Sequence, residues 1–383
     1  MHSGRRRHKI LFLIHSLGFG GAERQLSYLA SGLKQRGHDV SVAVFYPQGP
    51  YFAELRGAGV RIVSLDKRGR LDLLSFTSRL LRLVRRERPD VIYGFMPMEN
   101  LAALIVARLV RPRIPVVWGI RASDVDATVY GLLSTAVYKL QEWLVRAPDL
   151  VISNSHAAFA NPGLKVPPNR AMVIPNGIDV ARFCPDTALH LAGRGILGID
   201  GNGPVVAIVG RLDPMKGHEC FLRAAEIVAR HASDARFLVV GSGSHAYRLS
   251  MMRIADGLGI GGRLIWRDAF RDIEVIYNSI DVLVSSSIFG EGFPNVVAEA
   301  MACGAAVVAC SVGDAARVMG THGHLVPRAD PEALAAAVLE ALASRSVQRA
   351  AARREWIVDK FSIDRLVTDT EAALAAVVGA GTL

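Results

Sequence analysis

The stretch GEGFPNVVAEAMACG, residues 290–304, says most about how this 383-residue chain folds. An apolar run at 282–284 precedes it and ends in serines, which predicts a buried strand that opens onto a loop. Gly290 and Gly292 permit a tight turn, and Pro294 suits the first position of the helix that follows. A glycine loop at a helix start presents free backbone N–H groups, which favour a phosphate or a sugar hydroxyl.

Two glutamates of this stretch are candidate binding residues. Glu291 would stand at the mouth of the loop. Glu299 would lie one to two turns into the helix, where a carboxylate can accept hydrogen bonds from both hydroxyls of a ribose-like diol. The alternative for each is a solvated surface position. The glycine-rich context favours a site.

Length and composition set the outer bounds. A chain of 383 residues suits two domains of roughly 150 to 200 residues each. A hydrophobic content of 51% excludes a disordered chain. The four cysteines lack CxxC spacing, so we expect buried thiols in a reducing compartment. The apolar run at 10–14 is too short for a signal peptide, and no run reaches the roughly 18 apolar residues of a membrane span. We therefore expect a cytoplasmic protein, soluble or peripheral to the membrane.

Strand and helix patterns alternate along the chain. Valine- and isoleucine-rich strands with helices between them predict parallel sheets that are covered on both faces. The expected strands are 9–14, 40–45, 61–65, 91–95, 116–119, 150–153, 172–174, 205–210, 236–240, 263–266, 281–285, 306–309 and 324–326. Helical patterns between them include 22–35, 221–230 and 331–344. The predicted fold is α/β, with two Rossmann-like, doubly wound domains whose strand carboxyl ends face a central cleft.

The loop GFGGAE, residues 18–23, follows the first predicted strand. Gly20 and Gly21 would let the backbone approach an anion closely, and Glu23 falls in the first helical turn. The loop is not a P-loop, because it lacks the Lys and the Ser or Thr that hold phosphate and magnesium. A simple tight turn is the alternative to an acceptor or phosphate site.

The loop GRLDPMKG, residues 210–217, follows the first strand of the second half. Arg211 and Lys216 are two cations that a turn through Pro214 could bring toward one point, which suits a pyrophosphate. A solvated basic loop is the alternative. GSGSHA, at 241–246, resembles the dinucleotide fingerprint loosely, but no acid about 20 residues further on could hold a ribose, so nicotinamide binding is excluded.

A possible metal motif lies near the middle of the first half. Asp124 and Asp126 spell the DxD pattern that holds a divalent cation in some sugar-transferring enzymes, but no other carboxylate cluster accompanies them. We expect no metal and no other cofactor. Arg121 and Asp124, just past the strand at 116–119, are instead expected to line the cleft and bind the acceptor.

Charge is unevenly distributed. Residues 1–175 hold 25 Lys and Arg against 12 Asp and Glu, whereas residues 176–383 hold 20 against 23. A basic half could face an anionic membrane, a pyrophosphate-bearing acceptor or nucleic acid. Nucleic acid is the weakest of these and is not expected, because the basic segments lack interleaved aromatics and no DNA- or RNA-binding motif appears. The segment 73–88 has an apolar face and a basic face, as does a helix that lies on a membrane. Its basic face holds Arg79, Arg82, Arg85, Arg86 and Arg88. A sheet-packing helix with a solvated face is the alternative.

Taken together, these motifs resemble a known family, the GT-B fold retaining glycosyltransferases of family 4. The resemblance covers nearly the whole chain. It is carried by GGAE at 20–23, NGID at 176–179 with Phe183, GRLDPMKG, the Glu291/Glu299 pair, and FSIDRL at 361–366. GIR followed by S-D, at 119–124, is similar to a branch of exopolysaccharide and lipid-linked oligosaccharide transferases. Many family members have a histidine where Arg121 stands, so no histidine role is transferred.

The resemblance implies an acceptor-binding domain at 1–180, a nucleotide-sugar-binding domain at 181–360, and a C-terminal helix at 361–383 that crosses back onto the first domain. It implies that Arg211 and Lys216 stabilise the departing diphosphate, that Glu291 contacts the donor sugar, and that Glu299 contacts the ribose. The remaining expected donor-binding residues are Gly210, Gly241, Gly243, Gly292, Phe293, Pro294 and Asn295.

The implied function is retaining, metal-independent transfer of a hexose or N-acetylhexosamine in cell-surface polysaccharide synthesis. The donor would be a nucleotide sugar, and a UDP-sugar is the first expectation. The acceptor would be a saccharide or a lipid-linked sugar. The protein would work on the inner face of the cell membrane. A UDP-sugar epimerase on the same scaffold and a non-catalytic nucleotide-sugar binder are the alternatives.

Overall fold

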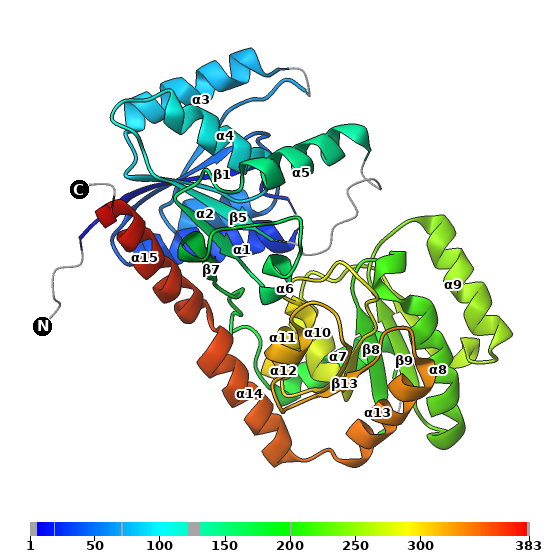
Figure 1. Ribbon diagram of the computed structural model, residues 1–383. Coiled ribbons are helices and arrows are strands. Elements are labelled where there is room, and N and C mark those ends of the chain that lie inside the picture. The colour runs from blue at the N-terminus through cyan, green and yellow to red at the C-terminus, as the bar shows by residue number, and fades with distance from the viewer. Residues whose placement is uncertain (1–5, 19, 70–71, 122–130, 200, 381–383) are drawn as a thin grey trace, which may run out of the picture. The chain divides into compact units, whose positions relative to one another are not determined.

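The computed structural model describes residues 6–18, 20–69, 72–121, 131–199 and 201–380 (Figure 1). The chain folds into two compact units, which are treated separately below. Unit 1 is Met1–Gly177 with Ile363–Leu383, and unit 2 is Ile178–Ser362. The sequence-based boundaries at 180 and 360 therefore lie within a few residues of the points where the chain passes between the units.

Unit 1 is built on a parallel sheet of order β3-β2-β1-β4-β5-β6-β7. Its strands are β1 (Lys9–Ile14), β2 (Asp39–Val44), β3 (Arg61–Ser64), β4 (Val91–Gly94), β5 (Val116–Ile120), β6 (Leu150–Ser153) and β7 (Ala171–Val173). Its helices are α1 (Gly21–Gln35), α2 (Tyr51–Gly57), α3 (Leu74–Glu87), α4 (Pro97–Arg108), α5 (Leu132–Leu144), α6 (His156–Phe159) and α15 (Ile363–Ala380).

Helices cover both faces of this sheet (Figure 1). Side chains of α1, α2 and α15 pack on one face, and those of α3, α4 and α5 on the other. The C-terminal helix α15 belongs to this unit, where Val367 packs against Gly32 of α1 and Arg36 pairs with Glu371 at 2.8 Å. The strands are buried on both sides, which is why their sequences are nearly continuous apolar runs.

Unit 2 repeats this plan with a parallel sheet of order β10-β9-β8-β11-β12-β13. Its strands are β8 (Val205–Val209), β9 (Arg236–Val240), β10 (Leu264–Arg267), β11 (Val282–Ser285), β12 (Ala306–Cys310) and β13 (His324–Val326). Its helices are α7 (Thr187–Leu197), α8 (His218–His231), α9 (His245–Gly257), α10 (Ile273–Ser279), α11 (Asn295–Ala302), α12 (Ala315–Met319), α13 (Pro331–Ala343) and α14 (Val347–Phe361).

The predicted fold class of two doubly wound parallel sheets is thus confirmed, with strand ends within a residue of those expected. One local prediction is wrong. Pro294 does not occupy the first helical position: its ψ of 90° keeps it extended, and α11 begins at Asn295. Pro294 is therefore the last residue of the loop and sets the direction in which α11 leaves it.

Candidate functional site

The site in unit 2 lies where the strand order reverses. β8 and β11 are neighbours in the sheet although two strands and three helices separate them in sequence. Loops at such a switch point diverge to opposite faces and leave a crevice at the carboxyl ends of the strands. Residues 210–217 (the β8 loop) and 286–294 (the β11 loop) begin at these two strand ends, so the topology brings the two most distinctive motifs of the sequence together.

The two loops are held against each other by backbone contacts. The Ile288 N–H donates to the Met215 carbonyl at 2.9 Å, and Ser286 Oγ donates to the Lys216 carbonyl at 2.9 Å. Gly217 has a φ of +65°, and a Cβ there would lie 2.1 Å from the Ser286 carbonyl oxygen. Only glycine combines that backbone angle with so close an approach. Lys216 is consequently fixed beside the β11 loop.

Lys216 and Glu291 form an ion pair, and Ser287 Oγ donates to the same Glu291 oxygen at 2.7 Å. Their side chains are 17% and 12% exposed. The stem of Lys216 lies along the backbone of Gly210, where a Cβ would come within 3.3 Å of the lysine Cε. Glu291 is therefore not a solvated surface acid. It is part of a preorganised charged cluster at the strand ends.

Arg211 lies differently. Its guanidinium is 56% exposed, and the nearest carboxylate is that of Asp213, at 3.7 Å. The sequence placed Arg211 and Lys216 around one point, but the structure ties Lys216 to Glu291 and leaves Arg211 in solvent. An exposed arginine beside a fixed lysine is free to swing onto an incoming anion.

Glu299 lies one turn into α11 and is almost completely buried, with 3% exposure. Tyr277 of α10 donates its hydroxyl proton to Glu299 Oε2 at 2.9 Å. Tyr277 is itself buried, so this hydrogen bond orients the carboxylate from behind. The sequence pointed to Glu299 but missed Tyr277, because an aromatic residue in a short helix has the pattern of an ordinary core residue.

The remaining predicted donor-binding residues shape the loops. A Cβ on Gly241 would lie 1.7 Å from the Gly210 carbonyl oxygen, and one on Gly243 would lie 2.2 Å from that of Leu212. Gly292 accepts a hydrogen bond from the Asp314 N–H at 2.9 Å. Phe293 points into the core, edge-on to Phe361 at 5.3 Å. These residues let three loops pack closely; Pro294 ends the β11 loop, and Asn295 starts α11.

Unit 1 has a cavity of about 450 Å³ at its own switch point, between β1 and β4. Its walls come from the ends of β1, β2 and β4 and from α1, α4 and α5. It is lined by His15, Glu23, Phe45, Tyr46, Lys67, Met96, Pro97, Met98, Glu99, Gly131, Leu133, Ser134, Val137 and Tyr138. The sequence predicted a ligand site near here from Gly20 and Gly21, but it did not point to His15 or Glu99.

Two carboxylates, those of Glu23 and Glu99, line this cavity. The Glu99 side chain is 2% exposed, and His15 Nδ1 lies 3.5 Å from its Oε1. Burial raises the pKa of Glu23 above its ordinary value, and the negative charge of Glu99 raises it further. The Glu23 carboxylate folds back over Gly20, where a Cβ would lie 2.1 Å from Oε2. The helix start is therefore occupied by the chain's own carboxylate, and the glycine makes room for it.

Arg121 lies at the end of β5. It donates to the Tyr93 hydroxyl at 2.9 Å, and its guanidinium carbon lies 3.9 Å from the centre of the Phe95 ring. Burial lowers its pKa, and within the described part of the chain its Nε and Nη1 atoms are buried without a hydrogen-bond partner. Asp124 lies outside the described residues, as does Asp126. Among the residues that are described, no three carboxylate, histidine or cysteine side chains gather as metal ligands would.

Comparisons with known proteins agree with this layout. Residues 19–182 match the family model described as Glycosyltransferase Family 4, and residues 203–344 match that described as Glycosyl transferases group 1. The chain is 30% identical over 262 residues to a D-inositol 3-phosphate glycosyltransferase of Mycolicibacterium vanbaalenii, covering 61% of this chain and 55% of that protein. It is 36% identical over 225 residues to the Geodermatophilus obscurus protein of the same name, covering 55% and 48%. The chain thus spans about half the length of these relatives.

Solved structures show the same fold. The Anabaena protein HepE in complex with UDP superimposes with a TM-score of 0.83 at 22% identity, over 96% of this chain and all of that one. A glycosyltransferase from Rickettsia africae also gives 0.83, at 17% identity over 98% of this chain and 99% of that one.

Proposed function

Because the chain belongs to the group 1 glycosyltransferases, we propose that it moves a hexose or N-acetylhexosamine from a nucleotide sugar, in the first place a UDP-sugar, to a saccharide or lipid-linked acceptor. The observation that carries this proposal is the cluster at the unit 2 switch point. Lys216 and Glu291 stand there at the strand ends, and the buried Glu299, one turn into α11, is held by Tyr277 of α10. HepE, which has the same fold, has been solved with UDP and with UDP-glucose.

The charges suggest how each group acts. Breaking the anomeric C–O bond leaves new negative charge on a diphosphate, which fixed cations stabilise best when they are already in place. Lys216 is held by Glu291 and Ser287, so it needs no reorganisation, and Arg211 supplies a second, mobile cation. Glu299, held by Tyr277, would accept hydrogen bonds from the ribose hydroxyls. The family resemblance adds retention of configuration, with the acceptor proton passing to the departing phosphate.

The proposed acceptor site is the cavity of unit 1. Two carboxylates, a histidine and Lys67 line it, and within the described residues Glu99 Oε1 is buried and accepts no hydrogen bond. Such a lining suits a hydroxyl-rich sugar, because sugar hydroxyls donate hydrogen bonds to carboxylates. Metal independence also remains part of the proposal: turnover should survive a chelator, and rescue by manganese would bring Asp124 and Asp126 back as ligands.

Docking on an anionic membrane remains part of the proposal, but the residues proposed to contact the membrane differ in part from those expected from the sequence. Arg79 was expected on the membrane face, but it donates to the Leu65 carbonyl at 2.7 Å and pairs with Asp72. Arg86 pairs with Glu87. Exposed apolar side chains instead mark α5, where Trp143 is 78% exposed and Leu140 44%. Exposed basic residues lie on α3 (Arg82 and Arg85) and on α5 (Lys139). Arg146, just past the end of α5, is also exposed.

The mixture of Trp143, Leu140 and Lys139 on α5 is typical of a helix that lies at a membrane interface. No described helix combines the length and apolar character needed to cross a bilayer. Co-sedimentation with anionic vesicles should fall with rising salt and fall in Trp143→Ser, whereas Arg79→Gln should have little effect. If wild type failed to sediment at low salt, the membrane would be excluded and a free saccharide favoured.

The proposed reaction is tested with the purified chain and a panel of UDP-, GDP- and ADP-sugars, scored for donor hydrolysis and for transfer to a lipid-linked or free sugar. Transfer or hydrolysis of a UDP-sugar supports the proposal. An isomerised donor would point to an epimerase instead. Binding of a donor without turnover of any donor would indicate a non-catalytic nucleotide-sugar binder.

A further inference from the structure

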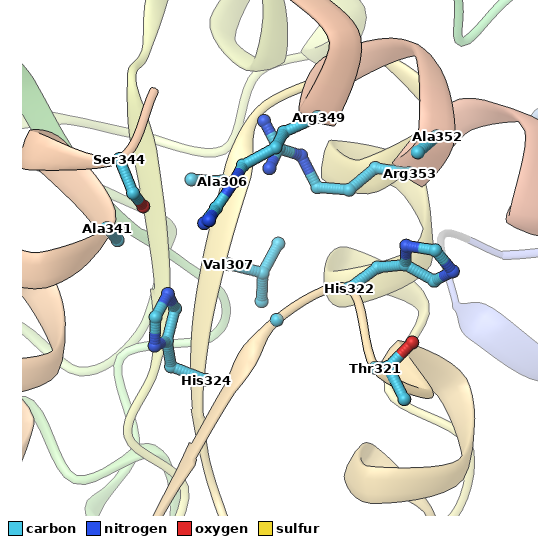
Figure 2. Close-up of a pocket in the computed structure, with 11 residues that line it drawn as sticks. Ala306, Val307, Thr321, His322, His324, Ala341, Ser344, Arg349, Ala352 and Arg353 are labelled. Atoms are coloured by element: carbon cyan, nitrogen blue, oxygen red, sulfur yellow. The ribbon is translucent and has the colours of Figure 1, made fainter. Parts of the chain in front are cut away.

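Unit 2 has a cavity at the end of its sheet opposite the switch-point loops. It opens where β12 and β13 begin, which is the edge opposite the carboxyl ends of the strands. It encloses about 220 Å³ between the starts of these strands, the end of α13 and the first turns of α14 (Figure 2). The donor-binding cluster described above contributes no residue to its lining.

The ionisable side chains that line this cavity are all basic. They are His322, His324, Arg349 and Arg353, and no carboxylate is among the lining residues. Figure 2 shows the Arg349 side chain reaching from α14 past Ala306, with Ser344 and His324 on the far side of the space. The carboxylate of Glu340 lies outside the lining, 3.5 Å from His324 Nδ1, and its side chain is 71% exposed.

The two arginines repel each other. Arg353 is 7% exposed and donates from Nε and Nη2 to the Gly304 carbonyl at 3.1 and 2.9 Å. Burial, and after it the charge of Arg349, lowers the pKa of Arg353. Arg349 has no ion-pair or hydrogen-bond partner for its guanidinium within the described part of the chain. Two arginines that line one cavity without a carboxylate, one buried and one unpaired, favour a bound anion in that cavity.

We propose that this cavity binds a phosphate group, either inorganic phosphate or the phosphate of a small monoester. Arg349 would hold the anion by forked hydrogen bonds, with His324, the Ser344 hydroxyl and the positive field of Arg353 completing the site. The volume admits a phosphate with a small substituent and excludes a whole nucleotide sugar. Arg353 also holds Gly304, which follows the end of α11, so an anion here stabilises the helix that carries Glu299.

The site can be tested by calorimetry on the full chain, with inorganic phosphate and glycerol phosphate as probes. Each titration is run at constant ionic strength in saturating UDP, so that the switch-point loops are not available to the probe. We expect saturable binding of at least one probe, weakened tenfold or more in Arg349→Gln. The matched control is Arg230→Gln, which removes an exposed arginine of α8 and should leave binding unchanged.

The tighter probe identifies the source of the phosphate. His324→Asn should weaken binding less than Arg349→Gln does, since it removes a single donor. The proposal is overturned if neither probe binds, if Arg349→Gln binds as wild type does, or if both arginine variants weaken binding equally, which would mean a non-specific effect of charge.

Discussion

The switch points of the two units share a topology and differ in chemistry. Each sheet reverses its strand order beside its first strand, and each first strand ends in a glycine-rich loop. In unit 2 that loop places Lys216 against Glu291, with the N–H groups of α11 close by. In unit 1 the helix start is covered by the carboxylate of Glu23, next to the buried Glu99. In the proposed function, the shared topology sets where each ligand binds, and these side chains select an anion in unit 2 and a polyol in unit 1.

The largest expected effect is on turnover, and it comes from removing the lysine of the charged cluster in unit 2. Lys216→Ala should lower turnover by a factor of roughly 100 or more, since it removes a charge that acts mainly on the departing diphosphate. Steady-state kinetics with a UDP-sugar measures this. Arg223→Ala, which removes an exposed, ion-paired arginine of α8, is the control and should keep normal turnover. Near-normal turnover of Lys216→Ala would show that the diphosphate is stabilised elsewhere.

The next prediction concerns the acidic cavity of unit 1 and is tested by substituting Glu99. Glu99→Gln keeps the size of the side chain but removes the charge that faces His15. If unit 1 holds a hydroxyl-rich acceptor, KM for the acceptor should rise about tenfold, since a hydrogen bond to a charged group contributes roughly 1.5 kcal/mol, while KM for the donor stays unchanged. Initial rates at varied acceptor concentration provide the measurement. A rise in donor KM instead would assign the carboxylate to the wrong substrate.

An effect on stability rather than on turnover concerns the helix that follows the β8 loop. His218 is buried at the start of α8, and its Nε2 has no hydrogen-bond partner within the described residues. Burial lowers its pKa to about 4. The unfolded chain takes up this proton near pH 6.5 and the folded chain does not, so stability present above that pH is lost as the pH falls toward 4.

Between pH 7 and pH 5 this loss should amount to about 2 kcal/mol. Urea unfolding at both pH values tests it: His218→Asn should lose less stability than wild type over the same interval. Equal losses in the two proteins would mean that His218 is not the group that titrates.

Much of this organisation could be predicted from the sequence. Buried parallel strands produce unbroken apolar runs, so both sheets and their carboxyl-end loops were found, and with them Lys216, Glu291 and Glu299. Tyr277, His15 and Glu99 were missed because their roles depend on contacts between distant elements and on no motif. Arg79 was misplaced for a similar reason: helical periodicity put it on a free face, but the chain before the helix supplies the carbonyl and carboxylate that bind it.

The most direct test of the account compares UDP binding in two charge-neutralised variants, Glu299→Gln in unit 2 and Glu99→Gln in unit 1. Both remove one buried carboxylate at a switch point. Isothermal titration with UDP should show affinity weakened about tenfold or more in Glu299→Gln, where the ribose loses a charged acceptor, and unchanged in Glu99→Gln. If Glu299→Gln bound UDP as wild type does, or if Glu99→Gln were the variant that lost binding, the assignment of the nucleotide to unit 2 would be wrong.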